Sequence, residues 1–93
     1  MPIYFHGEDT QAEIRAEELQ LRKANADVSA GQARVRNQEC LLADIAEQST
    51  AARQGERLVA LLKGSLIEWE RHRVLIEQRL TYLRERHRRE LES

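Results

Sequence analysis

Proline, glycine, cysteine and aromatic residues are all scarce in this chain. Its 93 residues include one proline, four glycines and one cysteine, and aromatic residues make up only 4%. Together with 33% charged residues, this composition is the profile of a protein built from long helices. The single cysteine, Cys40, excludes an internal disulfide and suits a reducing compartment.

An excess of one charge is also lacking, because 15 basic residues nearly balance 16 acidic ones. Global charge therefore gives no reason to expect nucleic acid or an anionic membrane as a partner. No apolar run approaches the roughly 18 residues of a membrane span, and the N-terminus lacks the basic-then-apolar layout of a signal peptide. We expect a soluble, cytoplasmic protein with no membrane partner.

The richest apolar stretch lies between residues 58 and 83. Its large apolar residues recur at alternating spacings of three and four: Val59, Leu62, Leu66, Trp69, Ile76, Leu80 and Leu83. This spacing predicts a helix that packs against another helix along its whole length, and we call such a line of inward residues a seam. Arg73 fills the one gap in this seam, where we expect a register-setting polar contact with an acid such as Asp27.

An earlier stretch has a thinner seam with the same period. Two series alternate along it: Ile14, Leu21, Val28, Val35 and Leu42, and between them Glu17, Ala24, Gly31, Gln38 and Ile45. Thr10 and Glu13 have the spacing of a capping box, which predicts a helix start just after Thr10. The small residues Ala24 and Gly31 would let a neighbouring helix approach closely.

The sequence thus predicts an all-α helical hairpin, a short antiparallel coiled coil over residues 10–93. Helix one covers about 11–48, the turn about 48–50 with Ser49 or Thr50 as cap, and helix two about 51–91. Folding the chain back at Ser49 places Gly31 close to Trp69 on the second helix. One unbroken rod of about 80 residues, roughly 120 Å long, is the competing interpretation. Residues 1–9 are expected to form an extended arm that covers the bundle end or adds to a partner's sheet edge or groove.

Helix two also carries apolar residues outside its seam. We predict that these bind a partner: Leu61, Ile67, Val74, Leu75 and Tyr82. A two-helix core this small rarely yields more than about 3–5 kcal/mol, so a second apolar surface indicates association. A homodimer forming an antiparallel four-helix bundle is the economical arrangement, and a helix of another protein is the alternative occupant.

Motifs for chemistry are missing. The histidines His6, His72 and His87 fit neither a Glu-x-x-His nor a His-Glu-x-x-His pattern, and Cys40 has no CxxC partner. We therefore expect a non-enzymatic scaffold or protein-interaction module with no catalytic residue, cofactor, metal or small-molecule substrate. A nucleic-acid-associated regulator is the alternative function, and it would use the basic helix end at Arg84, Arg86, Arg88 and Arg89.

A resemblance supports the hairpin. The segment from Gly31 to Leu42, with its basic-apolar-basic triplet Arg34-Val35-Arg36, resembles short, uncharacterised alphaproteobacterial helical-hairpin proteins. The similarity continues through Leu58-Val59, Leu62, Leu66, Arg73, Ile76 and Leu80 and covers about residues 24–80. At the turn, where those proteins often have glycine, this chain has Ser49. The family implies a hairpin fold and no particular activity.

Overall fold

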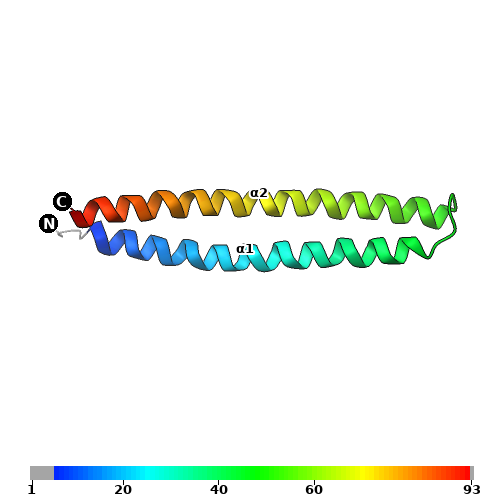
Figure 1. The fold of residues 1–93 in the computed structure, drawn as a ribbon, viewed down its shortest axis with the longest axis horizontal. Helices are drawn as coiled ribbons and strands as arrows, with labels where there is room; N and C mark the ends of the chain where they lie inside the picture. Colours follow the sequence, from blue (N-terminus) through cyan, green and yellow to red (C-terminus); the bar gives the residue numbers. More distant parts are fainter. Residues whose placement is uncertain (1–5, 93) are drawn as a thin grey trace.

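The computed structural model describes residues 6–92 of the chain, and the side chains of residues 9–92. Over this range the chain forms two α-helices, α1 (His6–Ala43) and α2 (Thr50–Glu92). Figure 1 shows them antiparallel and side by side, so that residues 6 and 92 lie at the same end of a rod. The rod measures 70 × 19 × 15 Å. The prediction of an all-α hairpin is confirmed, and the competing interpretation of one continuous helix is wrong.

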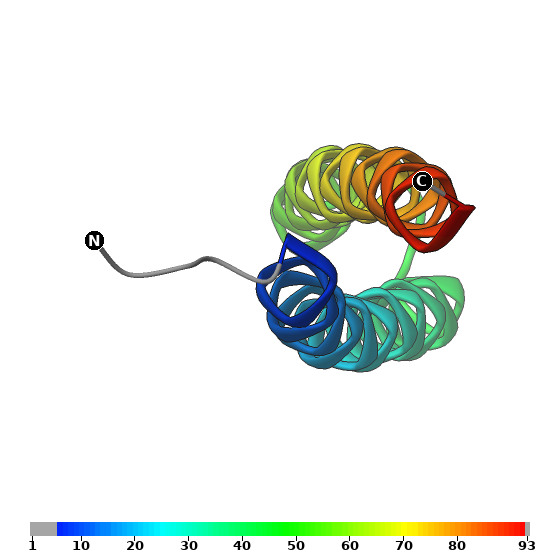
Figure 2. The same cartoon turned by 90° about the vertical axis from the view of Figure 1, so that its left-hand side faces the viewer.

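The two predicted seams meet between the helices. The buried apolar side chains all come from them or from the start of α2: Ala24, Val28, Val35, Ala52, Val59, Ile76, Leu80 and Leu83. Ile14 and Leu21 are partly buried and pack against the cluster of Ala24, Ile76 and Leu80. In the end view of Figure 2 the two helices wind around each other, which keeps a heptad seam in contact along the interface.

Trp69 departs from the predicted packing. Its side chain is 38% exposed, and its ring meets His72 edge-on, with centroids 6.3 Å apart. Gly31 instead faces Leu66, because a Cβ added at Gly31 would lie 3.2 Å from Leu66 Cδ1. The predicted contact between Gly31 and Trp69 is therefore wrong. The turn begins earlier than predicted, and this shifts the pairing along α2 toward the turn.

The turn occupies residues 44–49 rather than about 48–50. α1 ends at Ala43, five residues earlier than predicted, and the amides of Asp44 and Ile45 donate to carbonyls only three residues back, at 3.2 and 3.1 Å. Gln48 then takes a left-handed conformation with φ 61°. These six residues cross between the two packed helices, whose axes lie about 8–10 Å apart.

Ser49 caps α2, as one of the two predicted candidates. The Ala52 amide donates to Ser49 Oγ at 3.0 Å, which satisfies one of the free amides of the first helical turn. The Ser49 hydroxyl in turn donates to the Ala46 carbonyl at 2.8 Å. One side chain therefore fixes both the turn and the start of the second helix.

The start of α1 differs from the prediction as well. The helix begins at His6, so residues 6–9 are helical and not part of an extended arm. The predicted arm residues Ile3, Tyr4 and Phe5 lie outside the described residues. Thr10 does not cap the helix, because α1 has already begun at His6. Its buried hydroxyl instead donates to the Glu90 carboxylate at 2.8 Å. A tertiary contact has replaced the local capping box.

Gly64 offers a direct stability test. It is exposed in the interior of α2, and a Cβ added there meets no atom within 4 Å. Gly64→Ala should therefore raise the unfolding free energy by about 1 kcal/mol through helix propensity alone. Urea denaturation followed by circular dichroism measures this. Gly55→Ala is the matched control: its Cβ would come within 2.8 Å of Leu42 Cδ1, so its gain should be smaller or absent.

Candidate interaction surface on α2

The five predicted partner-binding residues all lie exposed on α2. We call them the outer face: Leu61, Ile67, Val74, Leu75 and Tyr82. Their exposed fractions range from 47% for Val74 to 70% for Leu61. The helical period explains this, because each is one or two positions away from a seam residue and so points away from α1. The predicted exposure of all five is confirmed.

The structure brings the middle of the outer face together in one shallow groove. Ile67, Val74 and Leu75 form its apolar lining, and the polar lining comes from Glu70, Arg71 and Gln78. Arg71 donates to the Glu68 carboxylate at 3.1 Å, so its charge is paired within the helix. Leu61 and Tyr82 lie outside this lining, on the same helix toward either end. An apolar centre with a polar rim is the usual anatomy of a protein–protein contact.

Further large apolar side chains are exposed elsewhere on the hairpin. Leu19 and Leu41 on α1 are about 60% exposed. Leu58 and Leu91 on α2 are 40% and 71% exposed. None of these four lines the groove with Ile67, Val74 and Leu75. The outer face is therefore the largest described group of exposed apolar residues on one helix.

A polar cluster that the sequence analysis missed ties the two helices together at the open end of the rod. This open-end cluster consists of Thr10, Glu13, Arg86 and Glu90. Arg86 donates to the Thr10 hydroxyl at 3.2 Å and also contacts the Glu13 carboxylate. Partial burial works against the Arg86 charge, yet Glu13 and Tyr82 outweigh it and raise the Arg86 pKa above its ordinary value. These contacts hold the Arg86 side chain between the two helices.

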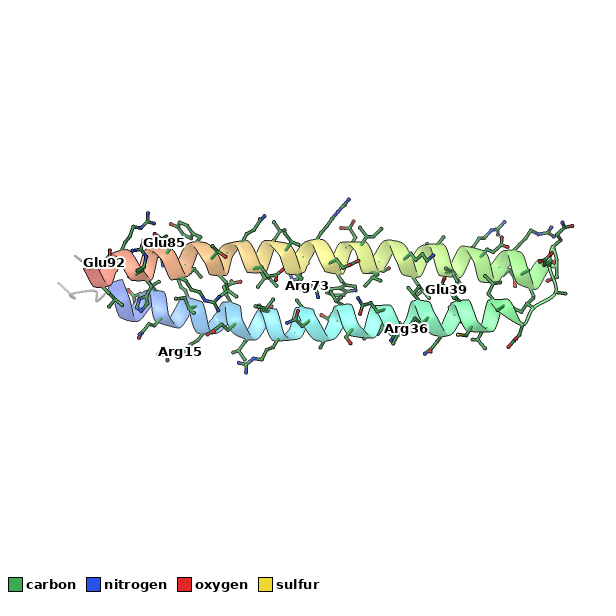
Figure 3. All side chains as sticks on the ribbon, viewed as in Figure 1. Arg15, Arg36, Glu39, Arg73, Glu85 and Glu92 are labelled. Atoms are coloured by element: carbon green, nitrogen blue, oxygen red, sulfur yellow. The ribbon has the colours of Figure 1, made fainter. Side chains whose placement is uncertain are left out.

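The basic helix end is largely neutralised by carboxylates. Arg84 lies 3.5 Å from Glu18, and Arg88 pairs with Glu85 and, at 2.9 Å, with Glu92. The hydrogen bond from Arg88 lowers the Glu85 pKa, and the charges of Arg88 and Arg89 act in the same direction. Figure 3 shows Glu85 and Glu92 on the last turns of α2. Phosphate binding would have to break these pairs, so this arrangement gives the nucleic-acid hypothesis no support.

Arg73 faces α1 without the partner predicted for it. Figure 3 shows it on the side of α2 that faces α1, and it is half-buried there. Among the ion pairs of residues 9–92, none joins Arg73 to Asp27. The ion pairs between the helices lie on the flanks instead, with Glu17–Arg79 at 3.2 Å and Glu39–Lys63 at 3.7 Å. Exposed pairs of this kind contribute little energy each, but their spacing agrees with the antiparallel register.

The described side chains offer no other obvious chemistry. Across residues 9–92, no group of three or more His, Cys, Asp or Glu side chains is placed to hold a metal ion. Cys40 is exposed, and His87 Nε2 lies 3.5 Å from the Gln11 side-chain amide. The His6 side chain lies outside the described set. Neither α1 nor α2 has a segment long and apolar enough to cross a membrane.

Comparison of the chain with protein-family models, curated proteins and solved structures finds no match in any of the three. The resemblance to alphaproteobacterial hairpin proteins therefore stays a prediction.

Proposed function

We propose that this protein is a non-enzymatic helical scaffold that binds through the outer face of α2. The supporting observation is an imbalance in where its apolar side chains lie. Ten large hydrophobic side chains are exposed among the described residues, whereas the buried apolar core has eight members, two of which are alanines. Scattered apolar residues are normal on a protein surface, but here three of the ten line one groove.

The thin core supports association with a second layer of helices. The seam of α1 contributes Ala24, Val28 and Val35 as its buried apolar residues, none larger than valine. With so little buried volume, the free energy gained by packing two helices exceeds the conformational entropy cost of ordering about 90 residues by only a small amount. We therefore propose that two copies associate through the outer face into a four-helix bundle, which would remove its apolar groove from water.

A nucleic-acid-associated regulator is the alternative function. It would depend on Arg84, Arg86, Arg88 and Arg89, and no observation favours it, because the first three are engaged with carboxylates. Another helical protein could also cover the outer face, but the hairpin offers no feature that selects one. A second copy is the occupant that we propose.

The test is the solution mass of the parent and of Leu75→Glu by sedimentation equilibrium at micromolar concentrations. We expect the parent at twice 10.8 kDa and Leu75→Glu at the monomer mass with its helical content retained. Leu75 is 63% exposed, so a carboxylate there does not disturb the hairpin itself, but it cannot be buried between two copies.

Leu19→Glu is the matched control, because Leu19 is exposed to the same degree on the other helix. It should stay at the dimer mass. A parent that sediments as a monomer would overturn the proposed assembly. Equal dissociation of both variants would show that the outer face is not the contact surface.

A further inference from the structure

We infer that the two copies meet with α2 against α2 in antiparallel orientation, about a twofold axis that passes between Val74 and Leu75. This inference depends on the proposed dimer and specifies its register. It comes from a symmetry in the outer face that helix packing within one chain does not require.

Four of the five outer-face residues are arranged symmetrically about the midpoint between Val74 and Leu75. Ile67 lies seven residues before Val74, and Tyr82 lies seven residues after Leu75. An antiparallel copy centred on this midpoint therefore brings Ile67 level with Tyr82 of the second copy, and Val74 level with Leu75. A twofold interface uses the same patch on both subunits, so each of these two pairs forms twice in the dimer. All four are about half exposed or more in the hairpin.

The polar residues of the groove fit the same register. Arg71 lies three residues before Val74 and Gln78 three residues after Leu75, so they come level with each other. Gln78 can accept a hydrogen bond from Arg71, which already pairs with Glu68 in its own helix. The contact therefore buries no pair of like charges at its centre.

Neighbouring registers fit less well. An axis through Arg71 would set Arg71 directly against Arg71 of the second copy and would bring Tyr82 level with Ala60. An axis through Gln78 would bring Ile67 level with Arg89. Only the midpoint between Val74 and Leu75 matches the four apolar residues with one another and avoids a like-charge contact, which costs free energy when it is desolvated.

This register also predicts the shape of the dimer. The outer face lies opposite the seam, so the two α2 helices would occupy the centre and the two α1 helices the outside. The two rods would be offset by seven residues, or about 10 Å at 1.5 Å per residue. The 70 Å hairpin would thus form a particle about 80 Å long. Leu61 would lie near the end of the contact, level with Arg88, whose aliphatic stem can cover it.

Disulfide crosslinking between two single-cysteine chains tests the register. In a Cys40→Ser background, which removes the exposed native thiol, one chain carries Ile67→Cys and the other Tyr82→Cys. The two are mixed and equilibrated in a glutathione redox buffer, and the crosslinked species are identified by intact mass. We expect the mixed dimer to exceed each homodimer at least tenfold, because only residues 67 and 82 approach within the disulfide limit of about 7 Å between Cα atoms.

The control mixture pairs Leu19→Cys on α1 with Tyr82→Cys and should give no excess of mixed dimer. Predominant 67–67 and 82–82 crosslinks would overturn the inference in favour of a parallel arrangement. If chains that sediment as dimers give the three crosslinked species in statistical proportions, the register is wrong but the dimer stands. Chains that sediment as monomers would instead contradict the proposed function itself.

Discussion

Leu80→Ala should lower the free energy of unfolding by about 3 kcal/mol, within the range of about 2–5 kcal/mol measured for buried leucines. Leu80 is 1% exposed and lies in the cluster with Ala24 and Ile76, against which Ile14 and Leu21 pack. Its truncation removes apolar contact from this cluster, in which the one buried residue of α1 is an alanine. Urea denaturation followed by helical circular dichroism measures the loss.

Leu19→Ala is the control for this prediction. Leu19 is 60% exposed on α1, so the same truncation should change the unfolding free energy by no more than about 0.5 kcal/mol. Both variants are compared at one protein concentration, because association would otherwise contribute to the apparent stability. Similar losses at the two positions would show that Leu80 is not in a specifically packed core.

Gly31→Leu should destabilise the hairpin by about 1–3 kcal/mol, the usual cost of adding volume to a packed interface. Gly31 is buried, and even a Cβ at this position would come within 3.2 Å of Leu66 Cδ1. A full leucine side chain has no space there unless the helices move apart. Thermal and urea denaturation would both report the change.

Leu66→Ala in combination with Gly31→Leu provides the decisive comparison. If Gly31 faces Leu66, the truncation makes room for the new side chain, and the double variant should lose less stability than the two single variants added together. Trp69→Ala in place of Leu66→Ala should give no such rescue. If the stability losses of Gly31→Leu and Leu66→Ala simply add in the double variant, the two residues do not contact each other.

The seams could be read from the sequence because helix packing repeats with a fixed period. Every large apolar residue placed at a three-or-four spacing on helix two is at least partly buried except Trp69, and the thin seam of α1 faces α2 throughout. The exposure of Ile67, Val74 and Leu75 followed from the same period. These features depend on local spacing alone, and a single sequence contains that information.

The positions that the sequence did not predict depend on contacts between distant residues. Thr10 has the spacing of a capping residue, but α1 already begins at His6, and the Thr10 hydroxyl donates to Glu90 once the helices are paired. Trp69 occupies a seam position, yet the shifted register places Leu66 opposite Gly31 and leaves the indole 38% exposed. Trp69→Ala should therefore cost less than the roughly 3–5 kcal/mol of a fully buried tryptophan.

The open-end cluster has a consequence for the order in which the hairpin forms. Contacts beside the turn close short loops, whereas the hydrogen bond between Thr10 and Glu90 joins residues 80 positions apart. Each doubling of loop length adds about 0.6 kcal/mol of closure entropy, so pairing should spread from the turn and reach the cluster last. The same end should also be the first to fray. In the proposed dimer Tyr82, which lies on this late-forming half, packs against Ile67 nearer the turn of the second copy. Association would therefore stabilise the part of each hairpin that one chain closes least readily.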